Sequence, residues 1–236
     1  MALSHSLKIV TDDLILCLDA GDGKSYGGSG TTWTDRSGQN RNGTLKNMEG
    51  SDFDGSDKGG SLTFGGSNEK VEIDHFDYDR TNFTVEVVGK FNANHTYFQT
   101  AFFSKWQTGA GDDNEWTLGA RGESGPSEIV AVFEPYGGGS AHLLQTSYNY
   151  VVGTLYHILV TFNNGEAKLY VDGNLEDSDT CNFTEVRTYS GQKFNIAGFY
   201  SDFYTLCTIY LARMYNKALT ASEVLQNYNA TKGRFS

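Results

Sequence analysis

Short runs rich in Val, Ile, Phe, Tyr and Thr recur along the chain, separated by clusters of Gly, Asn, Asp and Ser. Apolar and polar positions alternate within many of these runs, which is typical of β-strands with one buried face. The pattern predicts strands at residues 14–19, 61–64, 70–73, 83–91, 101–106, 116–121, 129–134, 142–147, 155–162, 167–171, 193–198 and 205–215. Because no helical pattern is interleaved among them, we expect an all-β, antiparallel, jelly-roll-like sandwich.

Two turns are specified by their residues. Asn163-Asn164-Gly165 separates YHILVTF from EAKLYV, and Asn-Gly supplies the positive φ angles of a tight hairpin. Asp172-Gly173 turns the chain again after LYV. Together these turns predict a meander of three strands.

One short C-terminal helix is predicted from Leu219 to Gly233. Thr220 and Glu223 have the spacing of a capping box, and Leu219 has the spacing to pack on Val224 as a hydrophobic staple. An apolar stripe at helical spacing consists of Val224, Leu225 and Tyr228. We expect this helix to dock on the sandwich and to end at Gly233.

Composition narrows the class of protein. The 236 residues include 29 Asp and Glu against 18 Lys and Arg, giving a formal net charge of −11. This charge disfavours nucleic-acid binding, which depends on Lys and Arg. No stretch is long and apolar enough for membrane insertion. Without an internal repeat or a long linker, residues 1–236 are predicted to form a single domain.

The cysteines and the N-terminus bear on the compartment. Cys17 and Cys207 lie in apolar runs, and with Cys181 they make an odd number that cannot all pair within the chain. We expect buried, reduced thiols. The first residues, MALSHSLKIVTDD, do not have the pattern of a signal peptide. Both features favour synthesis in a cytoplasm.

Four segments at the two ends and in the middle of the chain carry a family pattern: LCLDAGDGKSYGGSGTTWTDRSGQNRNGTL, GGSLTFGGSNEKVEI, LYHILVTFNNGEAKLYVDGNL and MYNKALTASEVLQNYNATKGRF. They resemble the laminin-G-like, concanavalin A-like lectin/glucanase superfamily, in the version found in tailed-phage virion structural proteins. The last strand departs from the family pattern, because Tyr210 and Leu211 stand where the family usually carries two acidic residues.

This resemblance implies a non-enzymatic virion structural protein, as a capsid decoration or a tail or fibre component. Its expected partners are other virion proteins and host surface glycans, and symmetric assembly into an oligomer is expected. The expected location is the virion, after synthesis in the host cytoplasm. The alternatives are a glycan-processing enzyme of the glucanase type, a stand-alone carbohydrate-binding lectin and a decoration domain without a ligand.

No catalytic constellation is predicted. Glycoside hydrolysis requires two suitably spaced carboxylates, whereas the pair Glu72 and Asp74 reads as the polar face of a strand. Glu86 stands on the strand face opposite Phe83, Val85 and Val87, with no second acid beside it. His157 lies inside the YHILV strand and is interpreted as a sheet residue.

The candidate ligand-binding residues flank glycine-rich or acidic loops, where aromatic rings and planar polar groups suit carbohydrate recognition. They are Trp106, Trp116, Tyr136, Asn114, Glu115 and Arg121. The competing interpretation is that the tryptophans pack in the core.

No cofactor is predicted. Calcium stays open as an alternative, because it prefers carboxylate and carbonyl oxygens. Its weak candidate ligands are Asp19, Asp35 and Asn42. The competing interpretation is that these side chains cap turns through hydrogen bonds.

Overall fold

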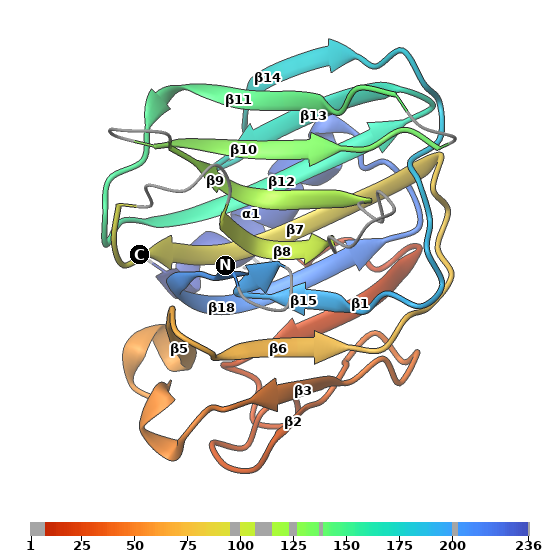
Figure 1. Ribbon diagram of the computed structural model, residues 1–236. Coiled ribbons are helices and arrows are strands. Elements are labelled where there is room, and N and C mark those ends of the chain that lie inside the picture. The colour runs from red at the N-terminus through yellow and green to blue at the C-terminus, as the bar shows by residue number, and fades with distance from the viewer. Residues whose placement is uncertain are drawn as a thin grey trace, which may run out of the picture.

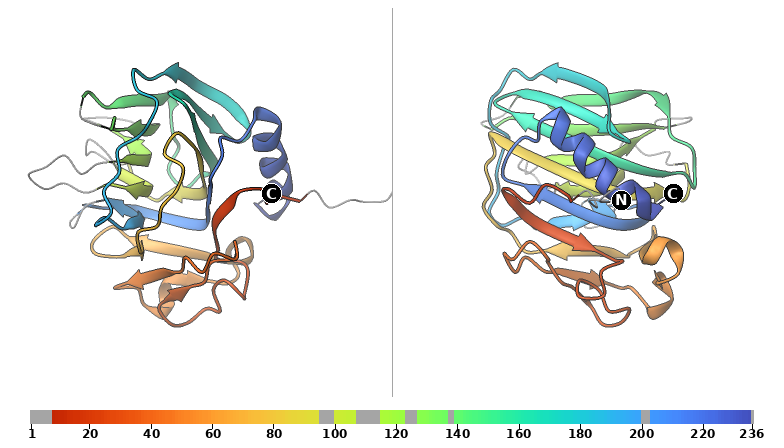
Figure 2. Two further views of the ribbon diagram at one scale, coloured as in Figure 1. Left: turned by 90° about the vertical axis from the view of Figure 1, so that its right-hand side faces the viewer. Right: turned by 180° about the vertical axis from the view of Figure 1, so that it is seen from behind.

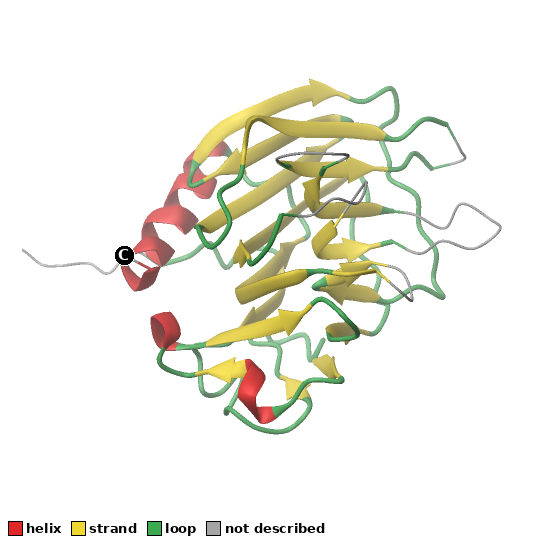
Figure 3. Ribbon diagram, turned by 60° about the vertical axis from the view of Figure 1, so that its left-hand side comes forward, coloured by secondary structure: helices red, strands yellow, loops and turns green. Residues whose placement is uncertain are grey.

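The structure is a computed structural model that describes residues 8–94, 100–106, 115–122, 127–136, 139–199 and 203–235. Two large antiparallel sheets lie face to face, and one C-terminal helix, α1 (Ala221–Phe235), lies along the outer face of one of them (Figures 1 and 2). Almost all other regular structure is strand, as Figure 3 shows. The expected antiparallel sandwich is confirmed.

Sheet A, the sheet beneath α1, contains eight strands. Its order is β14 (Asn174–Thr180), β13 (Glu166–Val171), β12 (Leu155–Asn163), β7 (Asn82–Phe91), β18 (Leu206–Tyr215), β5 (Ser61–Gly65) and β4 (Phe53–Asp54). The eighth strand, β1 (Leu14–Asp19), pairs with the C-terminal part of β18.

Sheet B, the opposite sheet, also contains eight strands. Its order is β11 (His142–Asn149), β10 (Glu128–Phe133), β9 (Trp116–Arg121), β8 (Thr100–Lys105), β15 (Phe194–Ile196), β6 (Lys70–Ile73), β3 (Gly43–Lys46) and β2 (Thr32–Trp33). A separate hairpin joins β16 (Gly198–Phe199) to β17 (Phe203–Tyr204). Two short 3₁₀ turns span Gly50–Asp52 and Asp57–Gly59.

Every strand predicted from the sequence is present, with its ends shifted by a few residues at most. The strand ranges predicted from the sequence did not include β2, β3, β4, β16 and β17, and β14 was predicted only as the third strand of the meander. Four of these have only two residues, and β14, NLEDSDT, is an exposed edge strand without apolar alternation. Their pairing therefore depends on neighbouring strands more than on local sequence.

The predicted meander is confirmed as β12–β13–β14. Asn164 and Gly165 have φ angles of 48° and 93° and connect the paired residues Asn163 and Glu166. A Cβ atom at Gly165 would lie 2.6 Å from the carbonyl oxygen of Phe183, so this position requires glycine for space as well as for its φ angle.

The N-terminus of α1 matches its prediction. The Thr220 amide donates to Glu223 Oε2 at 2.8 Å, and the Glu223 amide donates to Thr220 Oγ1 at 3.3 Å. Leu219 and Val224 are buried in one cluster, as the staple requires. The capping box and the staple therefore determine where the helix begins.

Two expectations about α1 were wrong. The helix continues past Gly233 to Phe235, and Arg234 bonds to the carbonyl oxygens of Lys58 and Gly60, which holds this last turn against the sandwich. Leu225 is 48% exposed instead of completing the apolar stripe. Its place against the sheet is taken by the buried Asn227.

The space between the sheets is filled mainly by aromatic and branched side chains. Phe83 stacks on Phe162 at 5.6 Å between ring centroids, and Phe91 stacks on Phe102 at 4.0 Å. The three cysteines are buried and form no disulfide, as predicted. In the part of the chain that the structure describes, no helix combines the length and apolarity needed to cross a bilayer.

Candidate functional site

Trp116 belongs to the core. Its side chain is 1% exposed, and its ring meets Phe103 edge to face at 5.2 Å between centroids. Its Nε1 atom donates to the hydroxyl of Tyr78 at 3.0 Å. With both its ring and its polar atom used internally, Trp116 presents no surface to a sugar, and the packing interpretation describes it better.

Glu115 forms a buried ion pair with Lys105, and both side chains are fully buried. The Glu115 carboxylate also accepts hydrogen bonds from the Tyr78 hydroxyl at 2.9 Å and the Tyr189 amide at 2.7 Å. Burial lowers the pKa of Lys105, although the Glu115 charge opposes this shift. Glu115 therefore has a structural role in the interior and does not face a ligand.

The remaining predicted ligand-binding residues lie in different surroundings. Trp106 is 8% exposed and packs in an apolar cluster with Val132 and Phe199, outside the main core. Tyr136 is 60% exposed, with the Arg80 guanidinium carbon 5.2 Å from its ring centroid. Arg121 is half-buried at the end of β9. Asn114 lies outside the described residues. The described members therefore do not make one open aromatic platform.

The side chains of the candidate calcium ligands already bond to groups of the protein itself. The buried Asp35 carboxylate accepts from the Cys17 amide at 2.8 Å and from the amide and hydroxyl of Ser37 at 2.8 and 2.7 Å. The Asp35 amide in turn donates to Asn42 Oδ1 at 2.9 Å. Asp19 forms an ion pair with Arg234. These contacts are the turn-capping arrangement, and the described residues contain no cluster of three or more His, Cys, Asp or Glu suited to a metal.

A polar hollow of about 450 Å³, which we call the edge pocket, lies where β2, β3 and β6 end sheet B. Its lining includes Asn40, Arg41, Asn42, Thr44, Asp74 and Phe76. The side chains of Asn40, Asn42, Thr44 and Asp74 are exposed, and the Cα atoms of Thr44 and Glu72 are paired across β3 and β6. The edge pocket therefore presents hydroxyl, amide and carboxylate groups to solvent.

Arg41 forms a flat wall of the edge pocket. Its guanidinium carbon lies 4.0 Å from the centroid of the Phe76 ring, which also stacks on Phe194 at 4.2 Å. Arg41 Nη1 donates to the Ile15 carbonyl at 3.0 Å. Burial lowers the pKa of Arg41, against the charge of Asp35. A guanidinium has several N–H donors, so this anchored group keeps donors for a ligand.

His75 adds an unpaired polar atom to the same place. It lines the edge pocket, and its Nδ1 atom is buried without a hydrogen-bond partner among the described residues. Its Nε2 atom lies 3.4 Å from Asp77 Oδ1. A buried nitrogen without a partner loses the hydrogen bond that water would supply, so a polar ligand here would gain from pairing with it.

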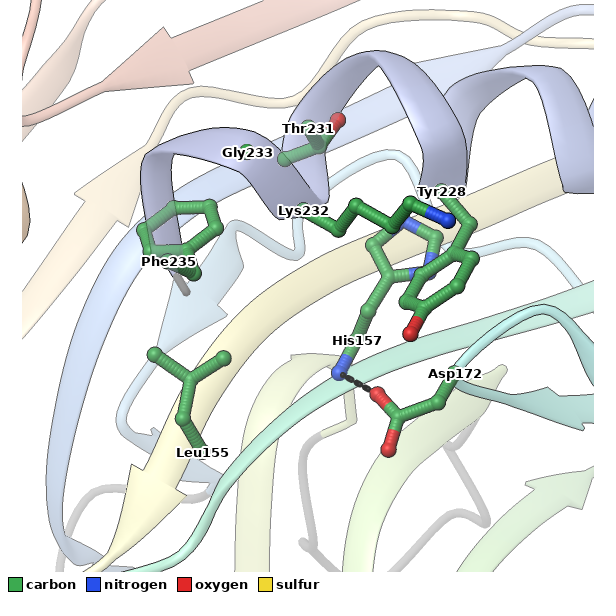
Figure 4. A pocket seen from close by; sticks show the side chains of 8 residues that line it. All are labelled: Leu155, His157, Asp172, Tyr228, Thr231, Lys232, Gly233 and Phe235. Atoms are coloured by element: carbon green, nitrogen blue, oxygen red, sulfur yellow. Dashed lines mark hydrogen bonds between the residues drawn. The ribbon is translucent and has the colours of Figure 1, made fainter.

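A second pocket, the helix pocket, lies between α1 and the outer face of sheet A and has a volume of about 370 Å³ (Figure 4). Its lining includes Leu155, His157, Asp172, Tyr228, Lys232 and Phe235. In Figure 4 the His157 imidazole rises from the sheet towards Tyr228 and Lys232 of the helix. Its walls are more apolar than those of the edge pocket.

A buried polar network adjoins the helix pocket. Glu86 is fully buried and accepts hydrogen bonds at 2.8 Å from His157 Nε2, Arg213 Nη1 and Asn227 Nδ2. The Tyr215 hydroxyl also lies 3.3 Å from Glu86 Oε2. Burial opposes ionisation, but the Arg213 charge and the His157 hydrogen bond outweigh it and lower the pKa of Glu86 to about 2.

Sequence patterns identified some residues of these pockets but did not place them in one site. Asn42 was a metal candidate, whereas its neighbours Arg41 and Thr44 were missed as edge-pocket residues. Asp74 was noted only as a strand-face acid. The usable signal was the spacing of exposed polar residues in RNGT and EIDHF, which face one sheet edge once β3 and β6 pair.

The sandwich fold agrees with the family comparison. The profile described as the concanavalin A-like lectin/glucanases superfamily, laminin G type, matches residues 64–225. The chain belongs to this superfamily. No curated protein matches it significantly.

Solved structures share the fold at low sequence identity. The ligand-binding domain of Botulinum neurotoxin serotype D, in complex with N-acetylneuraminic acid, has a TM-score of 0.69 and 16% identity over 93% of this chain and 51% of that one. Domain 4 of a GH43 extracellular arabinanase from Geobacillus stearothermophilus, in complex with arabinotriose, has a TM-score of 0.66 and 19% identity over 92% of this chain and 98% of that one. A Trypanosoma rangeli sialidase in complex with sialic acid has a TM-score of 0.65 and 14% identity over 94% of this chain and 33% of that one. The chain thus spans about half of the neurotoxin domain and a third of the sialidase.

Proposed function

We propose that this protein is a non-catalytic carbohydrate-binding domain and that it binds a glycan in the edge pocket. The observation that carries the proposal is the gathering of Asn40, Asn42, Thr44 and Asp74 around one hollow. Sugar hydroxyls both donate and accept hydrogen bonds, and these side chains offer both functions. The sugar ligands named for the fold neighbours agree with this class of ligand.

Arg41 supplies the flat surface that a sugar ring needs. Its guanidinium is held by the Phe76 ring beneath it and by the carbonyl of Ile15. Little side-chain freedom is then left to lose on binding, which favours affinity. The planar guanidinium also donates along its edge to ring or hydroxyl oxygens.

A binding role suits the acids beside the edge pocket better than hydrolysis does. Glu72 contacts Lys46, Lys70 and Lys193, and although burial opposes it, Lys70 and Lys193 lower the pKa of Glu72. The side chain of Asp74 is 92% exposed and contacts Lys193. A general acid needs a raised pKa to stay protonated near neutral pH. Glu72 does not have the environment for that role.

We further propose that the protein is a structural component of a tailed-phage virion, in the capsid decoration, tail or fibre. Its partners would be other virion proteins, and the edge pocket would contact host surface glycans. The support is the resemblance of both termini and the central hairpin to that version of the superfamily. Mass spectrometry of purified virions tests this role: we expect the chain in the particle, and its absence would refute the virion assignment.

A glycan array tests the binding function. We expect the wild-type protein to bind a defined set of glycans, with and without calcium, and Thr44→Ala and Asp74→Ala to weaken that binding. Thr180→Ala is the matched control, because Thr180 is also an exposed strand threonine but lies on β14 at the far edge of sheet A. Binding that survives both edge-pocket substitutions would place the glycan elsewhere, and no binding to any glycan would refute the function.

A further inference from the structure

We propose that the helix pocket is a second ligand-binding site, which takes a small, neutral molecule with a hydroxyl group on an apolar body. This proposal does not rest on glycan binding at the edge pocket. The two pockets are formed by different sheets, because the edge pocket borders sheet B and the helix pocket lies between sheet A and α1.

The hydrogen bonds of His157 define the polar requirement. Glu86, with its low pKa, is ionised at neutral pH and can only accept, so His157 Nε2 carries the proton in their 2.8 Å hydrogen bond. In the neutral imidazole the other nitrogen, Nδ1, then has a lone pair and accepts. This Nδ1 atom is buried and has no partner among the described residues, while its ring lines the pocket. The pocket therefore offers an unpaired acceptor to a donor on the ligand.

The walls define the apolar requirement. Leu155 and Phe235 line one part of the pocket, and the ring of Tyr228 lies 5.7 Å from the His157 imidazole between centroids (Figure 4). A volume of about 370 Å³ falls within the range of small-molecule pockets. A body such as a single aromatic ring fits this space and buries apolar surface against these side chains.

The charges around His157 favour a neutral hydroxyl over an ionic group. Lys232 and Asp172 line the pocket with opposite charges, and behind the ring Glu86 is balanced by Arg213. The other titratable groups near the ring are the hydroxyls of Tyr215 and Tyr228. A hydroxyl can donate to His157 Nδ1 and still accept from the Lys232 ammonium, whereas the opposite charges of Lys232 and Asp172 give the pocket no net charge to attract an ion.

The test compares two probes of similar size, phenol and toluene, which differ in the hydroxyl group. Binding is followed by NMR, through the side-chain nitrogen signals of His157 and the amide signals of α1. We expect phenol to shift the Nδ1 signal and to bind about tenfold more tightly than toluene, which is the value of one hydrogen bond to a buried acceptor. Equal affinities, or an Nδ1 signal that phenol leaves unchanged, would overturn the proposal and indicate an acceptor that is satisfied by water.

Two variants locate the binding. His157→Phe removes the acceptor and should reduce phenol to the affinity of toluene. Because this change also removes a hydrogen bond to Glu86, Leu155→Trp provides an independent test that fills the pocket without touching the buried network. Leu225→Trp, at an exposed position of α1, is its control. Phenol binding should be lost in Leu155→Trp and kept in Leu225→Trp, and retention in Leu155→Trp would refute the location.

Discussion

His157 Nε2 and Glu86 Oε1 lie 2.8 Å apart on the outer face of sheet A, beneath the helix. They come from neighbouring strands, β12 and β7, whose register pairs His157 with Val88 and Glu86 with Leu159. Asn227 of α1 donates to the same carboxylate and accepts from the Val10 amide at 2.8 Å. One buried acid thus connects the sheet, the helix and the segment before β1.

Acid should weaken the fold through Glu86. Its pKa is lowered to about 2 in the folded protein, below the ordinary value of 4.5. A lowered folded-state pKa gives stability that is complete above the unfolded-state value and is lost as the pH falls towards the folded-state value. We expect Glu86 to contribute about 3 kcal/mol that disappears between roughly pH 4.5 and pH 2. Urea unfolding across this range measures it.

Glu86→Gln isolates this contribution from those of other acids. At neutral pH it should cost about 3–5 kcal/mol, because it leaves the buried Arg213 without a counter-charge. Its unfolding free energy should then fall less steeply with acid than that of the wild type. Parallel pH profiles for the two proteins would show that another group carries the dependence.

Lys105 and Glu115 should behave as a coupled pair. Lys105→Met leaves the Glu115 carboxylate buried without its cation, which should cost about 3–5 kcal/mol. The double variant Lys105→Met/Glu115→Leu removes both charges and should recover part of this loss. Thermal or urea unfolding of Lys105→Met, Glu115→Leu and the double variant completes the cycle, and simple addition of the two single losses would contradict the coupling.

Alanine substitutions at Trp116 and Tyr136 should distinguish a residue that packs in the core from one that lies on the surface. Trp116→Ala removes a side chain that is 1% exposed and should lower the free energy of unfolding by about 3–5 kcal/mol. Tyr136→Ala, at a position that is 60% exposed, should change it by less than about 1 kcal/mol. Similar losses at both positions would show that Tyr136 also has a packing role.

Gly165→Ala tests the hairpin between β12 and β13. The φ angle of 93° and the nearby carbonyl of Phe183 both oppose a side chain, so the change should cost about 1–3 kcal/mol. Gly153→Ala is a useful comparison, because Gly153 has a φ of 78° but no heavy atom within 4 Å of an added Cβ. The loss should be larger at Gly165, and equal losses would mean that backbone strain alone accounts for it.

Local sequence patterns predicted most strands of the sandwich. Strand alternation identified the inward side chains Phe83, Val85 and Val87, and it placed Glu86 on the opposite face. It did not identify the partners of Glu86, because these depend on strand register and on the docking of α1. The same reason explains why Trp116 was left open between ligand binding and core packing: proximity to a glycine-rich loop does not show which face of β9 is inward.

The pockets depend on long-range arrangement for the same reason. Arg41 becomes a flat wall only because Phe76, which follows a different strand, lies beneath it. Short polar segments such as RNGT have no periodicity that distinguishes a pocket wall from an ordinary loop. The sequence therefore indicated a lectin-like fold through family resemblance, whereas the proposed location of the site depends on how the sheets pair.

Chemical-shift mapping with a glycan selected from the array tests the central claim most directly. Titration of the labelled protein should shift the amide signals of Arg41, Thr44 and Asp74 together, with one affinity, while signals from β14 stay in place. Thr44→Ala should weaken that affinity, and Thr180→Ala should not. A glycan that binds while the edge-pocket signals remain unchanged would contradict the account.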